Sequence, residues 1–220
     1  MLFSEENVRS NIRNRDGQRV FFLGDGDTLT PSARDYLTRE KIRILAAQQA
    51  KIQEYVLENG AVFREKPENF THLRGNILVP KTHPVIAFRG KMDSLQAQLL
   101  LAQKVCKVMG LDEILTLTRN IIRWDVLQEP AKPDKLLGLT EQELRQRSHD
   151  PQKYYGIPHF MPAVTDGEAV LRLNICRCAA REAELAAAHA FGNTRMDLLR
   201  SLNRISSAIY ILMIQAKQEG

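Results

Sequence analysis

The sequence predicts a mainly α-helical protein, in which a small mixed α/β segment precedes a helical bundle. Apolar residues recur at helical spacing from about Lys91 onward, and cap and stop residues divide this part into separate helices. Residues 1–70 instead alternate short apolar runs with turn residues. With 220 residues and 44% hydrophobic content, the chain has enough apolar side chains for the core of an ordinary domain.

The N-terminal part contains short elements of both kinds. Ser4, followed by two glutamates, is expected to start a short helix, and residues 20–23 and 41–45 have the character of strands. Between these strands, Thr30 is expected to cap a helix that has Pro31 at its first position. This order predicts a small β-α-β-like unit.

A polar stretch follows this unit. Residues 48–70 end in the sequence EKPENF and are predicted to form a linker. We therefore place a domain boundary near Thr71. Residues 1–70 are the N-terminal α/β-like segment and linker, and residues 71–220 are the helical-bundle domain.

Helical periodicity and end signals define the elements of the second part. Thr140 and Glu143 form a capping box at the start of a short helix, and Gly110 is a suitable end for a long one. Residues 84–88 are expected to be extended, and residues 149–162 to form a loop. The expected helices are residues 92–109, 112–128, 140–147, 166–192 and 194–217, with Asp166 and Thr194 starting the last two.

Charge and composition exclude several classes of protein. The net charge of +5 comes from basic residues interleaved with acidic ones, and only 6% of residues are aromatic, so we expect no nucleic-acid partner. No apolar run approaches the roughly 18 to 20 residues of a membrane span, and the N-terminal residues contain no apolar signal region. Three cysteines are too few for a disulfide framework. We therefore expect a soluble, cytoplasmic protein without a membrane partner.

The stretch NICRCAAREAE, residues 174–184, carries two of the cysteines on an expected helix. Cys176 and Cys178 lie about 200° apart around such a helix, so they cannot hold a metal or form a disulfide together. The five histidines show no metal-binding spacing with them. We expect both cysteines to pack in the protein as small hydrophobic residues.

The same stretch places polar residues on one face. Asn174, Arg177, Arg181 and Glu184 follow one another at i, i+3, i+7 and i+10. Two guanidinium groups one turn apart repel each other unless an anion or a carboxylate separates them, and arginine suits phosphate and carboxylate groups. A solvated face, with Glu184 as an ordinary partner, remains the alternative from the pattern alone.

Two other helices carry polar residues that suit such a site. Asp93 is expected in the first turn of a long helix, where the helix dipole favours a carboxylate and a neighbouring arginine can pair with it. Asn203 and Arg204 lie near the middle of the last helix, where an unpaired buried amide is costly. Exposure to solvent is the alternative for these residues.

Taken in order, four segments resemble the motifs of PduO-type ATP:corrinoid adenosyltransferases. These motifs are "sKdxPrieayGxvDELNs", "FxlPGG", "aRxvcRRAER" and "LNRLSDyLF", and their counterparts are VPKTHPVIAFRGKMDSL, HFMPAVTDG, ICRCAAREAE and LNRISSAIYIL. The segments LTPSARDYL and LGLTEQEL are similar to the EutT type, the ethanolamine-utilisation branch. The resemblance covers most of the chain from Leu29 onward.

The resemblance implies a five-helix bundle that forms a homotrimer with active sites between subunits. It also implies transfer of the 5′-deoxyadenosyl group of ATP to cob(I)alamin, which gives adenosylcobalamin and triphosphate. The implied ligands are ATP with Mg²⁺ and cobalamin, the substrate. Some EutT-type enzymes carry a His and a CCxxC cluster for a divalent transition metal in the region before the counterpart of Thr71. Here no cysteine precedes Cys106 and no histidine precedes His72, so the resemblance implies a form without a structural transition metal.

Site residues follow from matching the motifs position by position. Arg177 matches the arginine that pairs with the aspartate of "DELN", here Asp93, and these two residues with Arg181 are the expected catalytic residues. Phe160 or His159 takes the place of the corrinoid-facing phenylalanine, and we favour Phe160, because an imidazole could coordinate cobalt. The residues expected beside ATP are Lys81, Arg181, Glu184 and Asn203.

The chain also departs from these motifs. The "YTKTGDxGxT" phosphate loop has only a superficial counterpart in GDGDTLT, residues 24–30, whose glycine amides could face phosphates. In the other motifs, Glu182 and Leu185 replace two arginines, Ser207 replaces an aspartate, and Pro162-Ala163-Val164 replaces "PGG".

Partners are implied in the same way. They are a cobalamin reductase, further copies of the chain, and ethanolamine-utilisation or microcompartment proteins, with association to a bacterial microcompartment left open. Two alternative functions remain, a corrinoid-binding or delivery protein and a microcompartment interaction module, each without ATP chemistry.

Overall fold

The computed structural model describes every residue except 16, 48–53, 133 and 220. The chain divides into two compact units. The N-terminal unit comprises Met1–His83 with Val126–Gln128, and the helical unit comprises Pro84–Asp125 with Glu129–Gly220. Each unit is described by itself.

The N-terminal unit combines short strands with two helices, α1 (Glu5–Ser10) and α2 (Pro31–Arg39). Its described strands form a sheet of order β1-β4, a sheet of order β2-β3-β5 and a sheet of order β7-β6-β9-β8. They are β1 (Leu2–Phe3), β2 (Arg13–Arg15), β3 (Gln18–Leu23), β4 (Thr28–Leu29), β5 (Arg43–Ala46), β6 (Tyr55–Leu57), β7 (Val62–Phe63), β8 (Phe70–Arg74) and β9 (Ile77–Pro80).

A small apolar core and one buried amide hold this unit together. Val8 of α1, Phe21 of β3 and Leu37 of α2 are buried in one cluster. The Asn76 side chain accepts from the amide of Asn14 and donates to the carbonyl groups of Asn14 and Glu54, which joins two of the sheets. Because a buried amide without partners is costly, Asn76 stabilises this arrangement.

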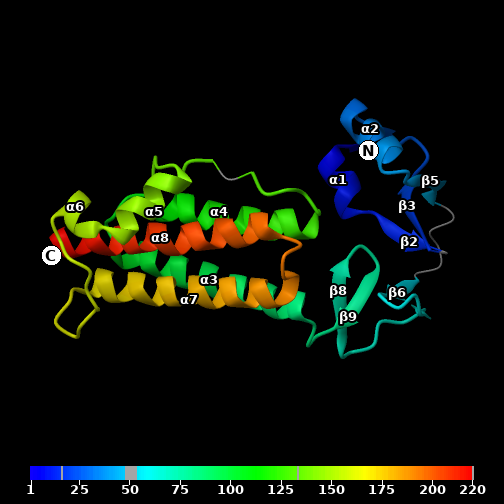
Figure 1. Ribbon diagram of the computed structural model, residues 1–220. Coiled ribbons are helices and arrows are strands. Elements are labelled where there is room, and N and C mark those ends of the chain that lie inside the picture. The colour runs from blue at the N-terminus through cyan, green and yellow to red at the C-terminus, as the bar shows by residue number, and fades with distance from the viewer. Residues whose placement is uncertain (16, 48–53, 133, 220) are drawn as a thin grey trace. The chain divides into compact units, whose positions relative to one another are not determined.

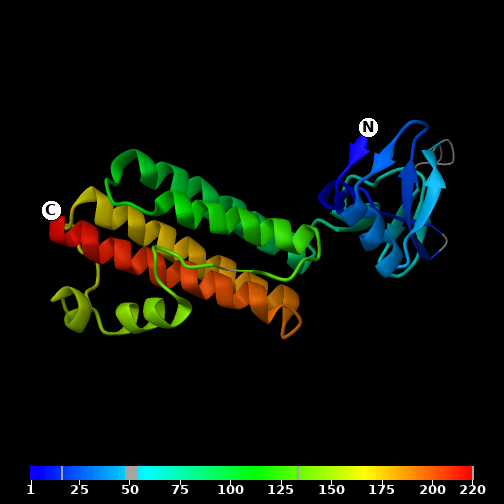
Figure 2. The ribbon, with the colours of Figure 1, turned by 90° about the horizontal axis from the view of Figure 1, so that it is seen from above.

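The helical unit contains four long helices and two short ones among its described residues. Figure 1 shows the long helices side by side, and Figure 2 gives the view from above. The helices are α3 (Pro84–Val105), α4 (Leu111–Val126), α5 (Glu141–His149), α6 (Pro151–Tyr155), α7 (Glu168–Phe191) and α8 (Met196–Glu219). Helix α7 packs against both α3 and α8, and α5 packs against α8.

Small side chains allow the close packing of α7. Ala180, Ala183 and Ala187 are fully buried at helical spacing, so the backbones of α3 and α8 can approach α7 closely. Between α3 and α4, Arg89 forms an ion pair of 2.8 Å with the buried carboxylate of Asp125. The core therefore fixes the face that α7 presents to α8.

Several expected elements are confirmed. The strands expected at residues 20–23 and 41–45 correspond to β3 and β5. Thr30 caps α2 with Pro31 in its first turn, and Thr140 with Glu143 forms the capping box of α5. The fold is mainly helical with small sheets. However, the described residues contain eight helices, six of them in the helical unit, so a five-helix bundle is not confirmed.

Other expectations are wrong. Residues 84–88 are not extended but form the first turn of α3, because Pro84 begins the helix, where a missing N–H costs nothing. The expected loop 149–162 contains α6, which Asp150 caps. Thr194 does not cap α8; its hydroxyl donates to the carbonyl of Phe191 in the preceding turn. In each case the residue that starts or ends the helix is visible in the sequence, but it was assigned to another element.

The stretch expected as a linker contains secondary structure. Residues 48–53 lie outside the described residues. Strands β6 and β7 follow, and β6 pairs in parallel with β9. The predicted boundary near Thr71 falls inside β8. Among the described helices, none has both the length and the apolar character needed to cross a bilayer.

Candidate active site

The α7 stripe, which we define as Asn174, Arg177, Arg181 and Glu184, lies on one face of α7 as its spacing predicts. Arg181 is exposed, and the other three side chains are half-buried. No ion pair or hydrogen bond of the Arg181 side chain occurs within the described part of the chain. The stripe therefore presents a cationic group without an anionic partner.

Glu184 and Asn203, two of the residues expected beside ATP, lie together. The Asn203 amide, Nδ2, donates to Oε1 of Glu184 over 3.2 Å, from α8 to α7. This bond fixes the amide with its Oδ1 available as an acceptor and leaves the second carboxylate oxygen of Glu184 available. The pair can therefore accept hydrogen bonds from a ligand.

Arg177 lies over an aromatic ring that the sequence interpretation did not single out. Its guanidinium carbon is 5.1 Å from the centre of the Tyr210 ring, a cation–π contact of about 1 kcal/mol. The Nε of Arg177 is buried and has no hydrogen-bond partner. A buried N–H donor without an acceptor is costly, so this group suits an acceptor from a ligand or another chain.

The expected pair of Arg177 with Asp93 is not formed within this chain. Asp93 is exposed on α3, and among the described residues no ion pair joins it to Arg177. Lys91, two residues earlier, instead pairs with Glu182 of α7 over 2.8 Å. Glu182, which replaces an arginine of the resembled motif, thus takes part in an exposed ion pair between α7 and α3. Leu185, which replaces the other, is 72% exposed and offers no polar group to a ligand.

A second stripe on α8 faces the first. We define the α8 stripe as Asn203, Tyr210 and Lys217, which follow one another at i, i+7 and i+14. Because seven residues complete almost two helical turns, the three side chains share one face. The i+7 spacing from Asn203 is the signal by which the sequence could have identified Tyr210.

The α8 stripe contacts the segment before α7, which we define as residues 159–166. His159 Nδ1 lies 3.0 Å from the Tyr210 hydroxyl, and the Phe160 ring stacks on the Tyr210 ring at 6.0 Å. Lys217 pairs with Asp166, which lowers the pKa of that carboxyl group, and its ammonium lies 4.6 Å from the centre of the Phe160 ring. Both candidates for the corrinoid-facing position, His159 and Phe160, thus contact α8.

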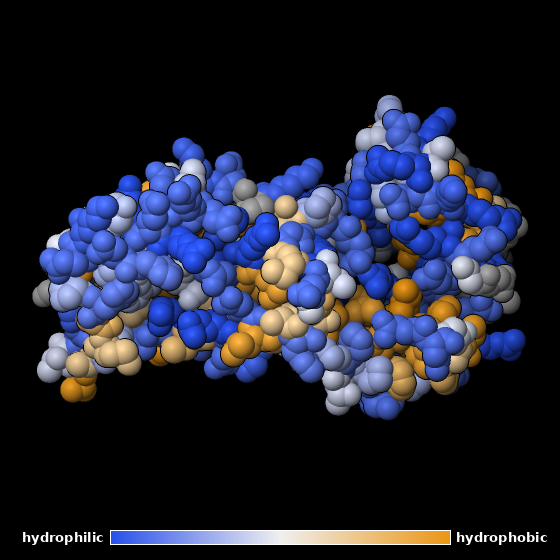
Figure 3. Space-filling model, viewed as in Figure 1, coloured by the Kyte–Doolittle hydropathy of each residue, from blue (hydrophilic) through white to orange (hydrophobic). Residues whose placement is uncertain are grey.

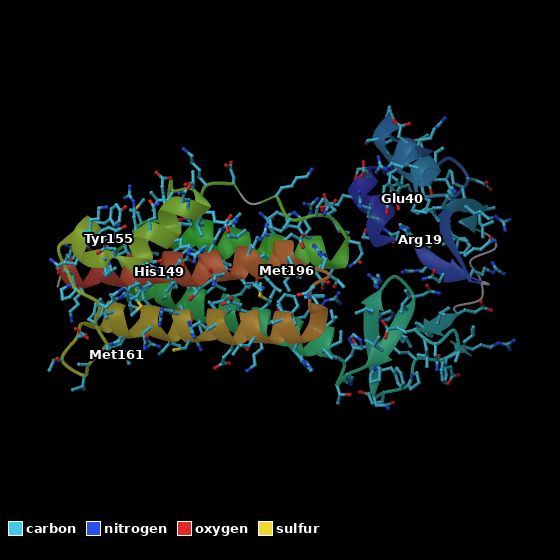
Figure 4. All side chains as sticks on the ribbon, viewed as in Figure 1. Arg19, Glu40, His149, Tyr155, Met161 and Met196 are labelled. Carbon is cyan, nitrogen blue, oxygen red and sulfur yellow. The ribbon has the colours of Figure 1, made fainter. Side chains whose placement is uncertain are left out.

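Two apolar side chains of this segment are exposed. Met161 is 88% exposed and Val164 is 93% exposed. Figure 3 shows a few apolar atoms along the lower edge of this end of the helical unit, whose surface in this view is otherwise mostly hydrophilic, and Figure 4 shows Met161 and Tyr155 at the same end. The expected corrinoid side therefore combines the Phe160 ring with exposed apolar side chains.

Arg204 neighbours Asn203 on α8 and pairs with Glu141 at the start of α5. A hydrogen bond from Arg204 lowers the pKa of the Glu141 carboxyl group. The Nε of Arg204 is buried and has no hydrogen-bond partner, like that of Arg177. Arg204 thus connects α5 to the face that carries Asn203.

Two expected phosphate contacts lie in the N-terminal unit. Lys81 forms an ion pair of 3.0 Å with Glu68. In GDGDTLT, the amide of Gly24 donates to the carboxylate of Asp27, which also accepts from the N-terminal ammonium of Met1, and the latter bond is the main reason for its lowered pKa. Because the Asp27 carboxylate occupies this turn, the turn does not suit a phosphate.

The cysteines behave differently from one another. Cys176 is buried, and burial raises the pKa of its thiol to about 12. Cys178 is exposed, so the expectation that it packs inside is wrong, since residues two apart on a helix point to different sides. The described residues contain no group of three or more His, Cys, Asp or Glu side chains that could hold a metal ion.

Comparison with known proteins bears on this arrangement. The family model for cobalamin adenosyltransferase matches residues 61–216. The chain is 30% identical over 246 residues to the corrinoid adenosyltransferase EutT of Salmonella typhimurium, with 97% of this chain and 91% of that protein covered. It is 28% identical over 255 residues to the EutT protein of Escherichia coli K12, with the same coverage. The family match includes the α7 stripe and, of the α8 stripe, Asn203 and Tyr210. The chain belongs to the cobalamin adenosyltransferase family.

Proposed function

We propose that this protein transfers the 5′-deoxyadenosyl group of ATP to the reduced cobalt of cobalamin, for ethanolamine utilisation. The products are adenosylcobalamin and triphosphate. Membership of the family and the names of the two EutT relatives support this reaction. Cob(I)alamin is itself the nucleophile, so the protein has to supply binding, orientation and charge compensation.

The observation that carries the proposal is that the described part of the chain provides no anionic partner for the two arginines of the α7 stripe. Arg181 is exposed, and Arg177 has a buried Nε without an acceptor. Triphosphate gains negative charge as it leaves, so guanidinium groups that face it stabilise the transition state. The exposed guanidinium of Arg181 fits phosphate oxygens, and we assign it the triphosphate of ATP, which binds with Mg²⁺, while Arg177 is assigned to the pair with Asp93.

Other residues orient the nucleotide in this proposal. Glu184 and Asn203, fixed to each other by a hydrogen bond, retain free acceptor atoms that suit the hydroxyl and amino groups of adenosine. We assign Lys81 to the phosphate side as well, and its pair with Glu68 is exposed, so exchange for a phosphate costs little.

Phe160 faces the corrinoid in this proposal. Its ring is held on Tyr210 and under the ammonium of Lys217. An aromatic ring can cover the lower face of the corrin without donating an electron pair to cobalt. It also excludes water from that face, which makes Co(II) easier to reduce.

We propose that the active form is a homotrimer of five-helix bundles with its sites between subunits. Within one bundle the five members are α3, α4, α5, α7 and α8, and α6 is a single turn. Exposed apolar side chains on α3 and α7 support an interface there. Asp93 of one copy then pairs with Arg177 of another, since neither group forms an ion pair with the residues that the structure describes. The exposed apolar residues are Leu100, Leu101, Val105, Ile175 and Leu185.

We also propose an electron donor, a location and the part of the chain that carries the reaction. A cobalamin reductase supplies the electron, and the protein acts in the cytoplasm, alone or with microcompartment proteins. The predicted domain boundary near Thr71 differs from the start of the family match at residue 61 and from the start of the helical unit at Pro84. We propose that residues 71–220 carry the reaction.

One experiment separates the enzyme from its alternatives. The protein is incubated with ATP, Mg²⁺ and chemically reduced cobalamin, and both products are measured. The enzyme gives adenosylcobalamin and triphosphate in equal amounts. A corrinoid delivery protein binds cobalamin without forming either product, and a microcompartment interaction module does neither, so lack of product under reducing conditions overturns the proposal.

A further inference from the structure

Both ring nitrogens of His159 are engaged. Nδ1 lies 3.0 Å from the hydroxyl oxygen of Tyr210, and Nε2 lies 3.0 Å from the backbone carbonyl oxygen of His149. The two rings stack at 5.7 Å with an angle of 12° between their planes. His159 is therefore fixed from two sides, by α8 and by the end of α5.

The chemistry of the two partners assigns the protons. A carbonyl oxygen only accepts, so Nε2 of His159 must carry a hydrogen and donate it to His149. In a neutral imidazole the other nitrogen then has the lone pair, and Nδ1 accepts from the Tyr210 hydroxyl. In the protonated ring both nitrogens donate. In neither state does His159 have a free lone pair.

We propose that the Tyr210 hydroxyl and the His149 carbonyl mask His159, so that its imidazole does not coordinate the cobalt of the corrinoid. This inference rests on the proposed function, in which the corrinoid binds beside Phe160, the next residue. A metal binds imidazole through a nitrogen lone pair, and the two hydrogen bonds leave no ring nitrogen with a free lone pair. Tyr210 is a positioning residue in this role, since it acts on cobalt only through His159.

The mask serves the reaction because an axial nitrogen donor opposes reduction. A nitrogen ligand adds electron density to Co(II) and makes the step to Co(I) harder. His159 is exposed, and it precedes the ring that we assign to the corrin face. Without the mask, an imidazole would be available next to the metal.

Tyr210 is well placed to act as the mask. Its side chain is only 7% exposed, and its ring is contacted by Arg177 and stacks with Phe160. These contacts hold the ring, so the hydroxyl stays directed at Nδ1. Tyr210→Phe removes the hydroxyl and keeps the ring, which separates the mask from the packing.

The first test uses the protein without corrinoid. Long-range nitrogen–proton NMR on histidine labelled with nitrogen-15 reports which ring nitrogen of His159 carries the proton. We expect the Nε2–H form in the parent protein, with the Nδ1 resonance shifted in Tyr210→Phe. Tyr154→Phe, which removes an exposed tyrosine hydroxyl from α6, should leave the resonance unchanged. A parent protein with its proton on Nδ1 alone overturns the mask.

The second test uses cob(II)inamide, which lacks the nucleotide base and so brings no nitrogen of its own to the lower face. Electron paramagnetic resonance should show no nitrogen splitting from the parent protein. Tyr210→Phe should gain such a splitting, and its multiplicity should change with nitrogen-15 histidine. The double variant Tyr210→Phe, His159→Phe should lose the splitting again.

The outcomes separate the two proposals. If Tyr210→Phe binds cob(II)inamide, as followed by the visible absorption change, and shows the parental resonance, the mask is wrong and the proposed function stands. If the parent protein fails to bind any corrinoid, the proposed function is wrong, and the proposal that His159 is kept from cobalt is wrong as well. The NMR measurement then still reports whether both nitrogens are engaged.

Discussion

Two parts of the face between α7 and α8 differ in how their polar groups are satisfied. At the end that holds the segment before α7, Lys217 pairs with Asp166, and Tyr210 with His159. In the middle of α7, the side chain of Arg181 and the Nε of Arg177 have no partner within the described residues. We call a polar group closed when it has a partner in the structure, and open when the described residues offer it none. The groups of the first part are closed, and those of the second part are open.

This difference predicts which polar groups affect the stability of the fold and which affect the reaction. A satisfied polar group stabilises the fold that it belongs to, and its loss leaves a buried partner behind. An unsatisfied cation contributes little to the fold, and its neighbour of like charge repels it. We therefore expect closed groups to affect the free energy of unfolding, and open groups to affect the reaction with ATP.

The largest effect is expected at Arg181. Arg181→Ala should lower kcat/KM for ATP by roughly 100-fold or more, because a charged group that faces the leaving triphosphate is lost. The melting temperature should stay the same or rise slightly. Steady-state kinetics with reduced cobalamin and calorimetry measure the two quantities.

An arginine elsewhere provides the control for this variant. Arg119 is exposed on α4 outside both stripes, and Arg119→Ala should keep the parental rate. A parental rate in Arg181→Ala would remove this residue from the site.

The second effect concerns Asp93 and Arg177. If they pair between copies, a double-mutant cycle of Asp93→Asn and Arg177→Gln should give a coupling energy of about 2 kcal/mol in the free energy of assembly. Analytical ultracentrifugation of the four proteins measures it. Additive effects of the two substitutions, with the rate unchanged in Asp93→Asn, would exclude the pair.

The third effect is on a closed group at the start of α8. Burial would raise the pKa of Asp197, but hydrogen bonds from Arg195 and from the amide of Ala131 hold it at about 2. Since this pKa lies below the ordinary aspartate pKa of 3.8, the stability that it contributes is complete at neutral pH and is lost as the pH falls from about 4 to about 2.

Asp197→Asn should therefore lower the free energy of unfolding by about 1 to 2 kcal/mol at pH 7, with little difference left at pH 2. Urea denaturation followed by circular dichroism checks both values. The exposed Asp134, substituted by Asn, serves as the matched control and should show neither change. A constant difference at all pH values would contradict the assigned pKa.

The smallest effect is expected at the cap of α5. The Thr140 hydroxyl accepts from the amide of Glu143, and the Glu143 carboxylate accepts from the amide of Thr140. Thr140→Ala should cost about 1 kcal/mol of unfolding free energy, and Thr140→Ser should retain most of it. The rate at saturating ATP should stay parental, because the Thr140 hydroxyl is a closed group. A large loss of rate would contradict the expectation that closed groups affect stability and not the reaction.

The sequence predicted the parts of the fold that depend on local signals. The cap at Thr30 was identified from a hydroxyl directly before Pro31, and the cap at Thr140 from a hydroxyl with Glu143 at fixed spacing. The start of α3 was missed because the apolar residues after Pro84 suit a strand as well as a helix. Pro84 at the first position of α3 is the local signal that favours the helix, and it was not used.

The same division applies to the site. The α7 stripe was predicted in full, since helical spacing alone places its residues on one face. Tyr210 and its contacts with His159 and Arg177 were missed, because they join a loop and two helices that are distant in sequence. The pair of Asp93 with Arg177 stays a prediction.

The contrast between the cysteines provides a practical means of measuring the assembly. Cys106 and Cys176 are buried, and their thiols have raised pKa values, mainly because of burial, so they remain protonated near neutral pH. Cys178 is exposed, next to Arg177. A maleimide spin label should therefore attach at this one position of the unmodified chain. Pulsed dipolar spectroscopy would then count the copies in the assembly and give the distance between their α7 helices.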